Sequence, residues 1–202
     1  MKTIVIIDYG LGNLRSVFRG IERCGGVPVI SSDIEVLRSA EAVILPGVGA
    51  FRDGMEQLGE MKDALLDAAR SVPVLGICLG MQMMLEWSEE HGMHKGLCLI
   101  PGTVRRFPRQ PGFKVPHMGW NDMVLDRPHP VLAGLATGDH AYFVHSYRFQ
   151  VADPAHLLAH VEYGGPVTAI VGRDTILGTQ FHPEKSQAAG LRLIGNFLGW
   201  RP

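Results

Sequence analysis

The sequence has few cysteines, no excess of charge of either sign and no apolar run long enough to cross a membrane. Its 3 cysteines, Cys24, Cys78 and Cys98, are an odd and sparse set, which fits reduced thiols better than a disulfide framework. The 19 Lys and Arg residues are balanced by 20 Asp and Glu residues, so the chain lacks the basic footprint of a nucleic-acid-binding protein. We therefore expect no nucleic acid and no membrane as a partner.

The first residues also lack the pattern of a secretory signal. Met-Lys-Thr-Ile-Val-Ile-Ile-Asp reads as a short apolar strand that ends in an acid, without the small residues of a cleavage site. This predicts a cytoplasmic protein. With 46% apolar residues, a chain of 202 residues can bury one substantial hydrophobic core, so we predict a single domain over residues 1–202.

The first half of the sequence alternates strand-like and helix-like segments, which predicts an α/β fold with a mostly parallel central sheet flanked by helices. After residue 96, short segments broken by Pro and Gly predict antiparallel additions to that sheet. The predicted strands cover residues 3–7, 27–30, 42–45, 73–77, 96–107, 113–125, 141–149, 157–163, 167–171 and 176–182. The predicted helices cover residues 14–24, 34–40, 61–70, 79–87 and 187–198, with Asn13 and Ser186 as N-caps of the first and last.

Two glycine-bearing turns follow predicted strands. Asp8-Tyr-Gly-Leu-Gly-Asn13 has Arg15 where a dinucleotide-binding fingerprint needs a small residue, so a tight strand-to-helix turn is the better interpretation. Pro46-Gly-Val-Gly-Ala-Phe51 lacks the Gly-Lys-Ser/Thr ending of a phosphate-binding loop. It is either a plain turn or an oxyanion strand, in which glycines let a backbone N–H face developing negative charge.

Cys78 lies in the stretch Gly76-Ile-Cys-Leu-Gly80, which has the spacing of a nucleophile elbow. In such an elbow a sharp strand-to-helix turn exposes the nucleophile, and small residues on both sides relieve crowding. The helix predicted to begin at Leu79 would place its positive end near the sulfur and favour the thiolate. Without a base elsewhere, a buried and inert cysteine is an equal alternative.

A candidate base follows the last predicted strand, in Gln180-Phe-His-Pro-Glu184. Pro183 restricts His182 to an extended conformation, and the two-residue spacing puts the side chains of His182 and Glu184 on the same side of the chain. A carboxylate that orients an imidazole in this way is typical of triads, in which the imidazole takes a proton from the nucleophile. The pair favours Cys78 as a nucleophile.

Three motifs resemble those of the class I glutamine amidotransferases, and the resemblance spans nearly the whole chain. They are Pro-Gly-Val-Gly at 46–49, Gly-Ile-Cys-Leu-Gly-Met-Gln at 76–82 and His-Pro-Glu at 182–184. The resemblance implies that Cys78 attacks the side-chain amide of glutamine, that His182 is general base and acid, and that Glu184 orients His182. It further places the oxyanion hole at the amides of Val48 and Leu79, and the glutamine against Gly49, Gln82, Ser146 and Tyr147.

The resemblance implies no cofactor and no metal. His91, His94 and Cys98 match no recognised zinc pattern. The segment from residue 89 to residue 110 has no counterpart among these motifs, so the sequence assigns no role to it.

Four further motifs resemble a group within the family whose members pass ammonia to a separate cyclase subunit. They are Asp8 to Asn13, Pro116-His-Met-Gly-Trp-Asn121, His145-Ser-Tyr147 and His182 to Ser186. The implied partner is a cyclase with a (β/α)-barrel fold, which forms a heterodimer with this chain. Such a barrel needs about 200 or more residues of its own, so we expect it on a separate chain. The residues expected at that interface are Asn13, Trp120, Asn121 and Lys185.

The resemblance also implies that glutamine hydrolysis is nearly silent until the cyclase binds its nucleotide substrate. The amide at Val48 is expected to be the movable part, since neighbouring glycines allow a peptide to turn.

Two alternatives stay open at the level of sequence. One is a non-catalytic module that only binds a small molecule, which the intact triad disfavours. The other is a different enzyme of the class, such as the glutaminase of pyridoxal phosphate synthesis or a γ-glutamyl hydrolase. Met118-Gly-Trp-Asn121 and Lys185 favour the cyclase-dependent group instead.

Overall fold

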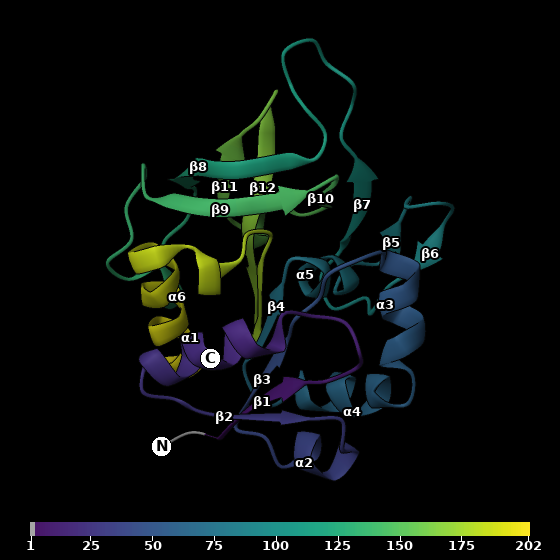
Figure 1. Ribbon diagram of the computed structural model, residues 1–202, viewed down its shortest axis with the longest axis vertical. Helices are drawn as coiled ribbons and strands as arrows, with labels where there is room; N and C mark the ends of the chain where they lie inside the picture. Colours follow the sequence, from purple (N-terminus) through teal and green to yellow (C-terminus); the bar gives the residue numbers. More distant parts are fainter. Residues whose placement is uncertain (1–2) are drawn as a thin grey trace.

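A nine-stranded mixed sheet forms the centre of the molecule, with the strand order β2-β1-β3-β4-β13-β12-β11-β8-β9 (Figure 1). The structure is a computed structural model that describes residues 3–202. The strands up to β13 in this order pair in parallel, and those from β13 onward pair in antiparallel fashion. The predicted α/β fold with antiparallel additions in the second half is therefore confirmed. The strands are β1 (Thr3–Ile7), β2 (Val27–Ser31), β3 (Ala42–Leu45), β4 (Val74–Ile77), β8 (His117–Leu125), β9 (His140–His145), β11 (Leu157–Glu162), β12 (Pro166–Arg173) and β13 (Ile176–Thr179).

A second, four-stranded sheet has the order β10-β7-β5-β6. Its strands are β5 (Trp87–Ser88), β6 (His94–Lys95), β7 (Gly102–Arg106) and β10 (Tyr147–Val151). The prediction of a single strand over 141–149 is wrong, because two strands of different sheets cover this range. The chain leaves the large sheet at His145 and enters the small sheet at Tyr147. Ser146 lies at this crossover between the two sheets.

Helices cover both faces of the parallel part of the sheet, and a side chain's position along β1 decides which face it joins. Ile4 and Ile6 pack with α1 and α6 in one core, whereas Val5 and Ile7 pack with α2 to α5 in the other. This alternation follows from the two-residue period of a strand. The helices are α1 (Leu14–Arg23), α2 (Ile34–Arg38), α3 (Phe51–Leu58), α4 (Met61–Ala68), α5 (Leu79–Met83) and α6 (Gln187–Gly199), and short 3-10 turns are η1 (Pro130–Leu132), η2 (Pro154–His156) and η3 (Pro183–Lys185). In the part of the chain that the structure describes, no helix is both long and apolar enough to cross a membrane.

Two helix predictions differ from the structure. The helix predicted over 79–87 ends at Met83, because the backbone carbonyls of Leu85 and Glu86 accept hydrogen bonds from the segment around Gly96. Helix α3 was not predicted, since Gly54 interrupts its apolar pattern. Gly54 is nevertheless needed there, because a Cβ atom would lie 2.9 Å from the sulfur of Met83.

The two predicted N-caps occupy the N-cap positions of α1 and α6, but the described residues show no capping hydrogen bond from either side chain. The hydroxyl of Ser186 instead donates to the carbonyl oxygen of His182 at 2.7 Å and accepts from the amide of Tyr142 at 3.0 Å. Ser186 therefore fixes the segment that carries His182 rather than the helix that follows.

Candidate active site

Three neighbouring parallel strands bring the parts of the site together. Strands β3, β4 and β13 are adjacent, and each ends at the same edge of the sheet. Residues 46–49 directly follow β3, Cys78 directly follows β4, and His182 follows β13. Segments far apart in the sequence thus meet at the carboxyl ends of the strands, where open α/β sheets bind their ligands.

Cys78 occupies the sharp turn between β4 and α5 that the spacing predicts. Its φ of 53° and ψ of −107° lie in a region that side chains rarely adopt, so the surrounding structure must impose this conformation. The flanking glycines make it possible. A Cβ atom at Gly80 would collide with the carbonyl oxygen of Leu45, and one at Gly76 would lie 2.7 Å from the amide nitrogen of Met81.

His182 and Glu184 form a buried hydrogen-bonded pair beside Cys78. The Nδ1 atom of His182 lies 2.9 Å from the Oε1 atom of Glu184, and the Glu184 side chain is completely buried. Burial alone would lower the pKa of His182, but hydrogen bonds to Cys78 and Glu184 and the negative charges of both raise it to about 9. The site therefore favours the imidazolium form of His182.

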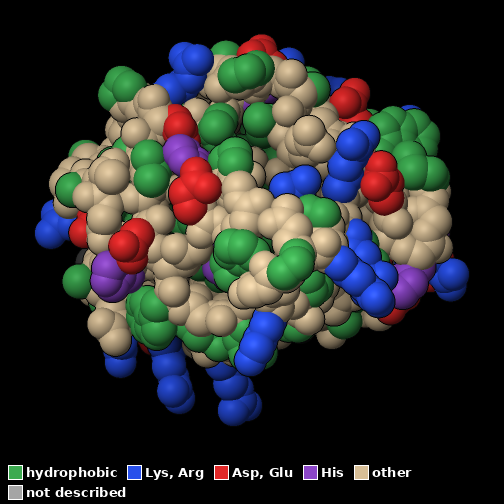
Figure 2. Space-filling model, turned by 90° about the horizontal axis from the view of Figure 1, so that it is seen from above, with side chains coloured by type: hydrophobic (Ala, Val, Ile, Leu, Met, Phe, Trp, Pro, Cys, Tyr) green, Lys and Arg blue, Asp and Glu red, His purple; other side chains and the backbone are tan. Residues whose placement is uncertain are grey.

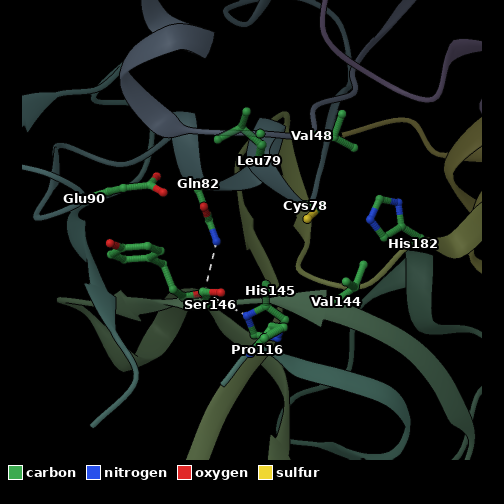
Figure 3. Close-up of a pocket in the computed structure, with 12 residues that line it drawn as sticks. Val48, Cys78, Leu79, Gln82, Glu90, Pro116, Val144, His145, Ser146 and His182 are labelled. Atoms are coloured by element: carbon green, nitrogen blue, oxygen red, sulfur yellow. Dashed lines mark hydrogen bonds between the residues drawn. The ribbon is translucent and has the colours of Figure 1, made fainter. Parts of the chain in front are cut away.

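A cavity of about 410 Å³ joins these groups (Figure 3). In the close-up, Gln82 and His182 lie on opposite sides of Cys78, and Val48 and Leu79 lie along one wall. The structure brings the predicted nucleophile, base, oxyanion residues and substrate-binding residues to this one cavity. Its lining residues are Val48, Gly49, Cys78, Leu79, Gln82, Glu90, Pro116, Val144, His145, Ser146, Tyr147 and His182.

The predicted oxyanion residues are both at the cavity, but one of the two amides is already engaged. The amide of Leu79 donates a hydrogen bond of 3.3 Å to the carbonyl oxygen of Gly47. Val48 exposes 42% of its surface, and Gly49 has a φ of 101°, which favours glycine. An oxyanion can reach the Leu79 amide only after the Gly47 carbonyl moves away.

Gln82 and Tyr147 are linked by a hydrogen bond across the cavity wall. The Nε2 atom of Gln82 donates to the backbone carbonyl of Tyr147 at 3.2 Å and to the Oε1 atom of Gln180 at 3.0 Å. Both N–H groups of this amide are therefore used inside the protein. The oxygen of the Gln82 amide remains to face a ligand.

The structure adds Glu90, a functional residue that the sequence did not indicate. Its side chain lines the cavity, and its carboxylate accepts a hydrogen bond of 2.8 Å from the amide of Phe51, at the start of α3. Glu90 belongs to the 89–110 segment, and no local pattern shows that this acid folds back to the end of β3.

The residues expected at a partner interface lie outside this cavity. Asn121 donates from Nδ2 to the carbonyl of Glu162 at 3.1 Å and lies 3.3 Å from a ring nitrogen of His117. Trp120 is 48% exposed, and Lys185 is also exposed. Seen from the side of β8 and β9, the surface carries several groups of hydrophobic side chains between charged ones (Figure 2).

Comparison with known proteins identifies the family of this chain. The family model described as "Glutamine amidotransferase class-I" matches residues 5–199. This chain belongs to that family.

Relatives support the narrower resemblance as well. The protein named imidazole glycerol phosphate synthase subunit HisH of Rhodospirillum rubrum is 52% identical and covers 98% of this chain and 99% of its own length. The protein of the same name from Halobacterium salinarum is 50% identical, with 98% and 93% covered.

Among solved structures, PurLQS from Thermotoga maritima has a TM-score of 0.77 at 18% identity and covers 98% of this amidotransferase and 99% of its own chain. A structure described as a glutamine amidotransferase has a TM-score of 0.75 at 20% identity, with 96% and 97% covered. At these identities the likeness concerns the fold alone.

The residues weighed as metal ligands do not form a site. Across residues 3–202, no three His, Cys, Asp or Glu side chains gather in a way that would hold a metal ion. His91 and Cys98 lie in loops, where both adopt positive φ values.

Proposed function

We propose that this amidotransferase, folded as one domain over residues 1–202, is the glutaminase subunit of imidazole glycerol phosphate synthase in histidine biosynthesis. It hydrolyses glutamine to glutamate and passes the ammonia to a separate cyclase, which makes imidazole glycerol phosphate and AICAR. The observation that carries the proposal is Cys78 on its elbow, facing the buried pair of His182 and Glu184 at the cavity. The names of relatives at 50% identity or more, imidazole glycerol phosphate synthase subunit HisH, support it.

In the first half-reaction, the Cys78 thiolate attacks the side-chain carbonyl carbon of glutamine. The carbonyl oxygen becomes an oxyanion, for which the amides of Val48 and Leu79 are the proposed donors. The C–N bond then breaks, the imidazolium of His182 gives its proton to the leaving nitrogen, and ammonia departs from a thioester.

In the second half-reaction, neutral His182 takes a proton from water, and the resulting hydroxide adds to the thioester carbon. The C–S bond breaks, glutamate leaves, and the thiolate faces the imidazolium again. Glu184 holds the imidazole in one orientation throughout, because its carboxylate accepts from Nδ1 and leaves Nε2 for the proton transfers.

The glutamine itself is expected to lie against Gly49, Gln82, Ser146 and Tyr147. Its α-ammonium group needs acceptors, and the cavity offers the side-chain oxygen of Gln82 and the carboxylate of Glu90. Glu90 also binds the amide of Phe51, so it connects the substrate site to the helix that follows the oxyanion segment.

Glutamine hydrolysis by the chain alone is expected to be nearly silent. The Leu79 amide is engaged by the Gly47 carbonyl, so the oxyanion hole forms only when the 46–49 segment turns. Val48 and its glycine neighbours are the movable part, and binding of the nucleotide substrate to the cyclase is the proposed trigger.

The proposed partner is a (β/α)-barrel cyclase in a heterodimer, located with this chain in the cytoplasm. Asn13, Trp120, Asn121 and Lys185 are the proposed contacts. Exposed Trp120 and Met118 support this face, because large apolar side chains at a surface are typical of protein interfaces. Ammonia protonates in water, so a sheltered route from Cys78 to the cyclase is part of the proposal.

The test is glutamate release by this chain, with and without the cyclase that acts with the Rhodospirillum rubrum relative and its nucleotide substrate. Release is expected only when all three are mixed, and Cys78→Ala should abolish it. Full activity of the isolated chain would contradict the proposed gating. No release with a competent cyclase and its nucleotide would contradict the assignment.

A further inference from the structure

Gln180 is a fully buried polar residue that the triad does not explain. It follows β13, two residues before His182, and its backbone amide donates to the carbonyl of Ala169 at 2.9 Å. It does not line the cavity, so a bound glutamine would not touch it. A buried side-chain amide is costly unless its donors and acceptor are satisfied, so its partners show what it does.

The orientation of this amide follows from a carbonyl group that can only accept. The carbonyl oxygen of Tyr147 lies 3.2 Å from the side-chain amide of Gln82. Because a carbonyl oxygen only accepts hydrogen bonds, the Gln82 atom that faces it must be the nitrogen, Nε2. The same nitrogen lies 3.0 Å from the Gln180 side chain, where it must meet an oxygen. The nitrogen of Gln180 therefore points the other way.

That nitrogen is aimed at the candidate nucleophile. The Nε2 atom of Gln180 lies 3.7 Å from the Sγ atom of Cys78, within the range of hydrogen bonds to sulfur. His182 lines the same cavity as this sulfur, and Cys78 is among the groups that raise the pKa of His182. A thiolate is a better acceptor than a thiol, so an N–H donor in this place favours the charged form and fixes the direction of the side chain.

We propose that Gln180 is a positioning residue for the nucleophile, whose amide N–H holds the sulfur of Cys78 in place opposite His182. The role of Cys78 comes from the proposed function, on which this inference rests. Gln180 transfers no proton and stays neutral. It keeps the sulfur directed at the substrate carbon while His182 changes its protonation state.

The test measures the sulfur directly, so it does not depend on glutamine turnover. Iodoacetamide alkylation of Cys78 is followed by mass spectrometry, with exposed Cys98 in the same sample as the internal standard. In Gln180→Met, which keeps the length of the side chain but has no donor, the Cys78 rate relative to Cys98 should fall about tenfold. Gln180→Glu can still accept the hydrogen bond from Gln82, but it turns an oxygen toward the sulfur. In this variant the Cys78 rate relative to Cys98 should fall at least as much as in Gln180→Met.

The matched control is Thr168→Val, a buried polar side chain on the neighbouring strand β12. It should leave the relative alkylation rate within about twofold, even if it lowers the melting temperature. If Gln180 had a purely structural role, its variants would behave like Thr168→Val, with a lower melting temperature but an unchanged relative alkylation rate. A relative rate within about twofold of the unmodified chain, in either folded Gln180 variant, would overturn the proposal. If Gln180→Met does not fold, Gln180→Glu carries the same comparison.

Glutamate release with the cyclase and its nucleotide is the second readout. In both Gln180 variants kcat should fall about tenfold while KM for glutamine changes less than about twofold, because Gln180 does not touch the substrate. If the unmodified chain releases no glutamate, the proposed function fails and the alkylation comparison still decides the role of Gln180.

Discussion

The hydroxyl group of Tyr9 donates a hydrogen bond of 2.6 Å to the carbonyl oxygen of Pro46. Burial and the negative charge of Cys78 raise the pKa of Tyr9, so the phenol keeps its proton and remains a donor. The turn after β1 also packs on Pro46, since a Cβ atom at Gly12 would lie 3.2 Å from the proline ring. The 46–49 segment is thus held at its first residue by the turn that carries Asn13.

Tyr9→Phe should loosen this hold. The Pro46 carbonyl loses its buried donor, so the free energy of unfolding should fall by about 1–3 kcal/mol. Glutamine hydrolysis by the isolated chain should rise, because the 46–49 segment gains freedom to turn. Tyr163→Phe is the control, since its hydroxyl donates to the carbonyl of Lys114 far from that segment. Equal basal rates in the two variants would contradict this role of Tyr9.

The raised pKa of His182 predicts a loss of stability at alkaline pH. The folded value is about 9 against an ordinary 6.5, so the contribution is complete below pH 6.5 and is lost as the pH rises toward 9. An NMR titration of the His182 ring should have its midpoint near 9. In Glu184→Gln the midpoint should be lower, because the carboxylate that favours the imidazolium is gone. An unchanged midpoint would contradict the ion pair.

His117 and His145 predict the opposite behaviour in acid. Burial lowers the pKa of His117 to about 4, and burial is also the main cause that lowers that of His145 to about 3. The unfolded chain binds protons that the folded chain does not, so stability is complete above pH 6.5 and falls as the pH drops toward 4.

Replacement of one of these rings should flatten that acid slope. Urea unfolding of His117→Leu should show lower stability at pH 7 than the unmodified chain, since the bond between His117 and His145 at 3.1 Å is lost. Between pH 6.5 and pH 4 the variant should lose about 2–3 kcal/mol less. Parallel pH profiles of the two proteins would show that His117 is not a source of the acid sensitivity.

Two glycines should respond to alanine in opposite ways. Gly80→Ala places a Cβ atom on the carbonyl oxygen of Leu45, and we expect a loss of more than about 3 kcal/mol or failure to fold. At Gly195, in the middle of α6, a Cβ atom would meet no described atom within 4 Å. Gly195→Ala should therefore stabilise the fold by about 0.5–1 kcal/mol, measured by urea unfolding. Destabilisation by Gly195→Ala would contradict the open space at that position.

Trp120→Ala should weaken binding to the cyclase by about 2 kcal/mol or more, because exposed tryptophans at interfaces carry much of the binding energy. The matched control is Trp87→Ala, which removes a tryptophan of similar exposure, 43% against 48%, from the other sheet. Calorimetric titration of each variant with the cyclase measures the difference. Equal affinities for the two variants would move the interface away from Trp120.

Local patterns predicted the parts of this structure that depend on near neighbours in sequence. The alternation of strand-like and helix-like segments indicated the fold, and the helix predicted from residue 14 is present as α1, with Val17 and Ile21 buried. The glycine spacing around Cys78 indicated the elbow, because the tight turn leaves no room for a side chain at Gly76 or Gly80. The two-residue spacing indicated that the side chains of His182 and Glu184 meet, although Pro183–Lys185 form a 3-10 turn and not the extended chain on which that prediction rested.

Contacts between distant segments could not be predicted in this way. The carboxylate of Glu90 meets Phe51 across 39 positions, and the Leu79 amide finds the carbonyl of Gly47 only after β3 and β4 pair. The side chain of Gln180 likewise reaches Cys78 across 102 positions. The partner that it meets there depends on Gln82 and on the strand crossover at Ser146.

The position of β13 sets the moment at which a newly made chain acquires its site. This strand is the last to leave the ribosome, yet it lies between β4 and β12 in the middle of the sheet and leads into His182. A nascent chain that has emerged only through β12 therefore has Cys78, the 46–49 segment and His145 of the cavity, but it lacks His182 and Glu184. The cavity around Cys78 is therefore complete only after β13 has inserted between its neighbours and His182 has followed it.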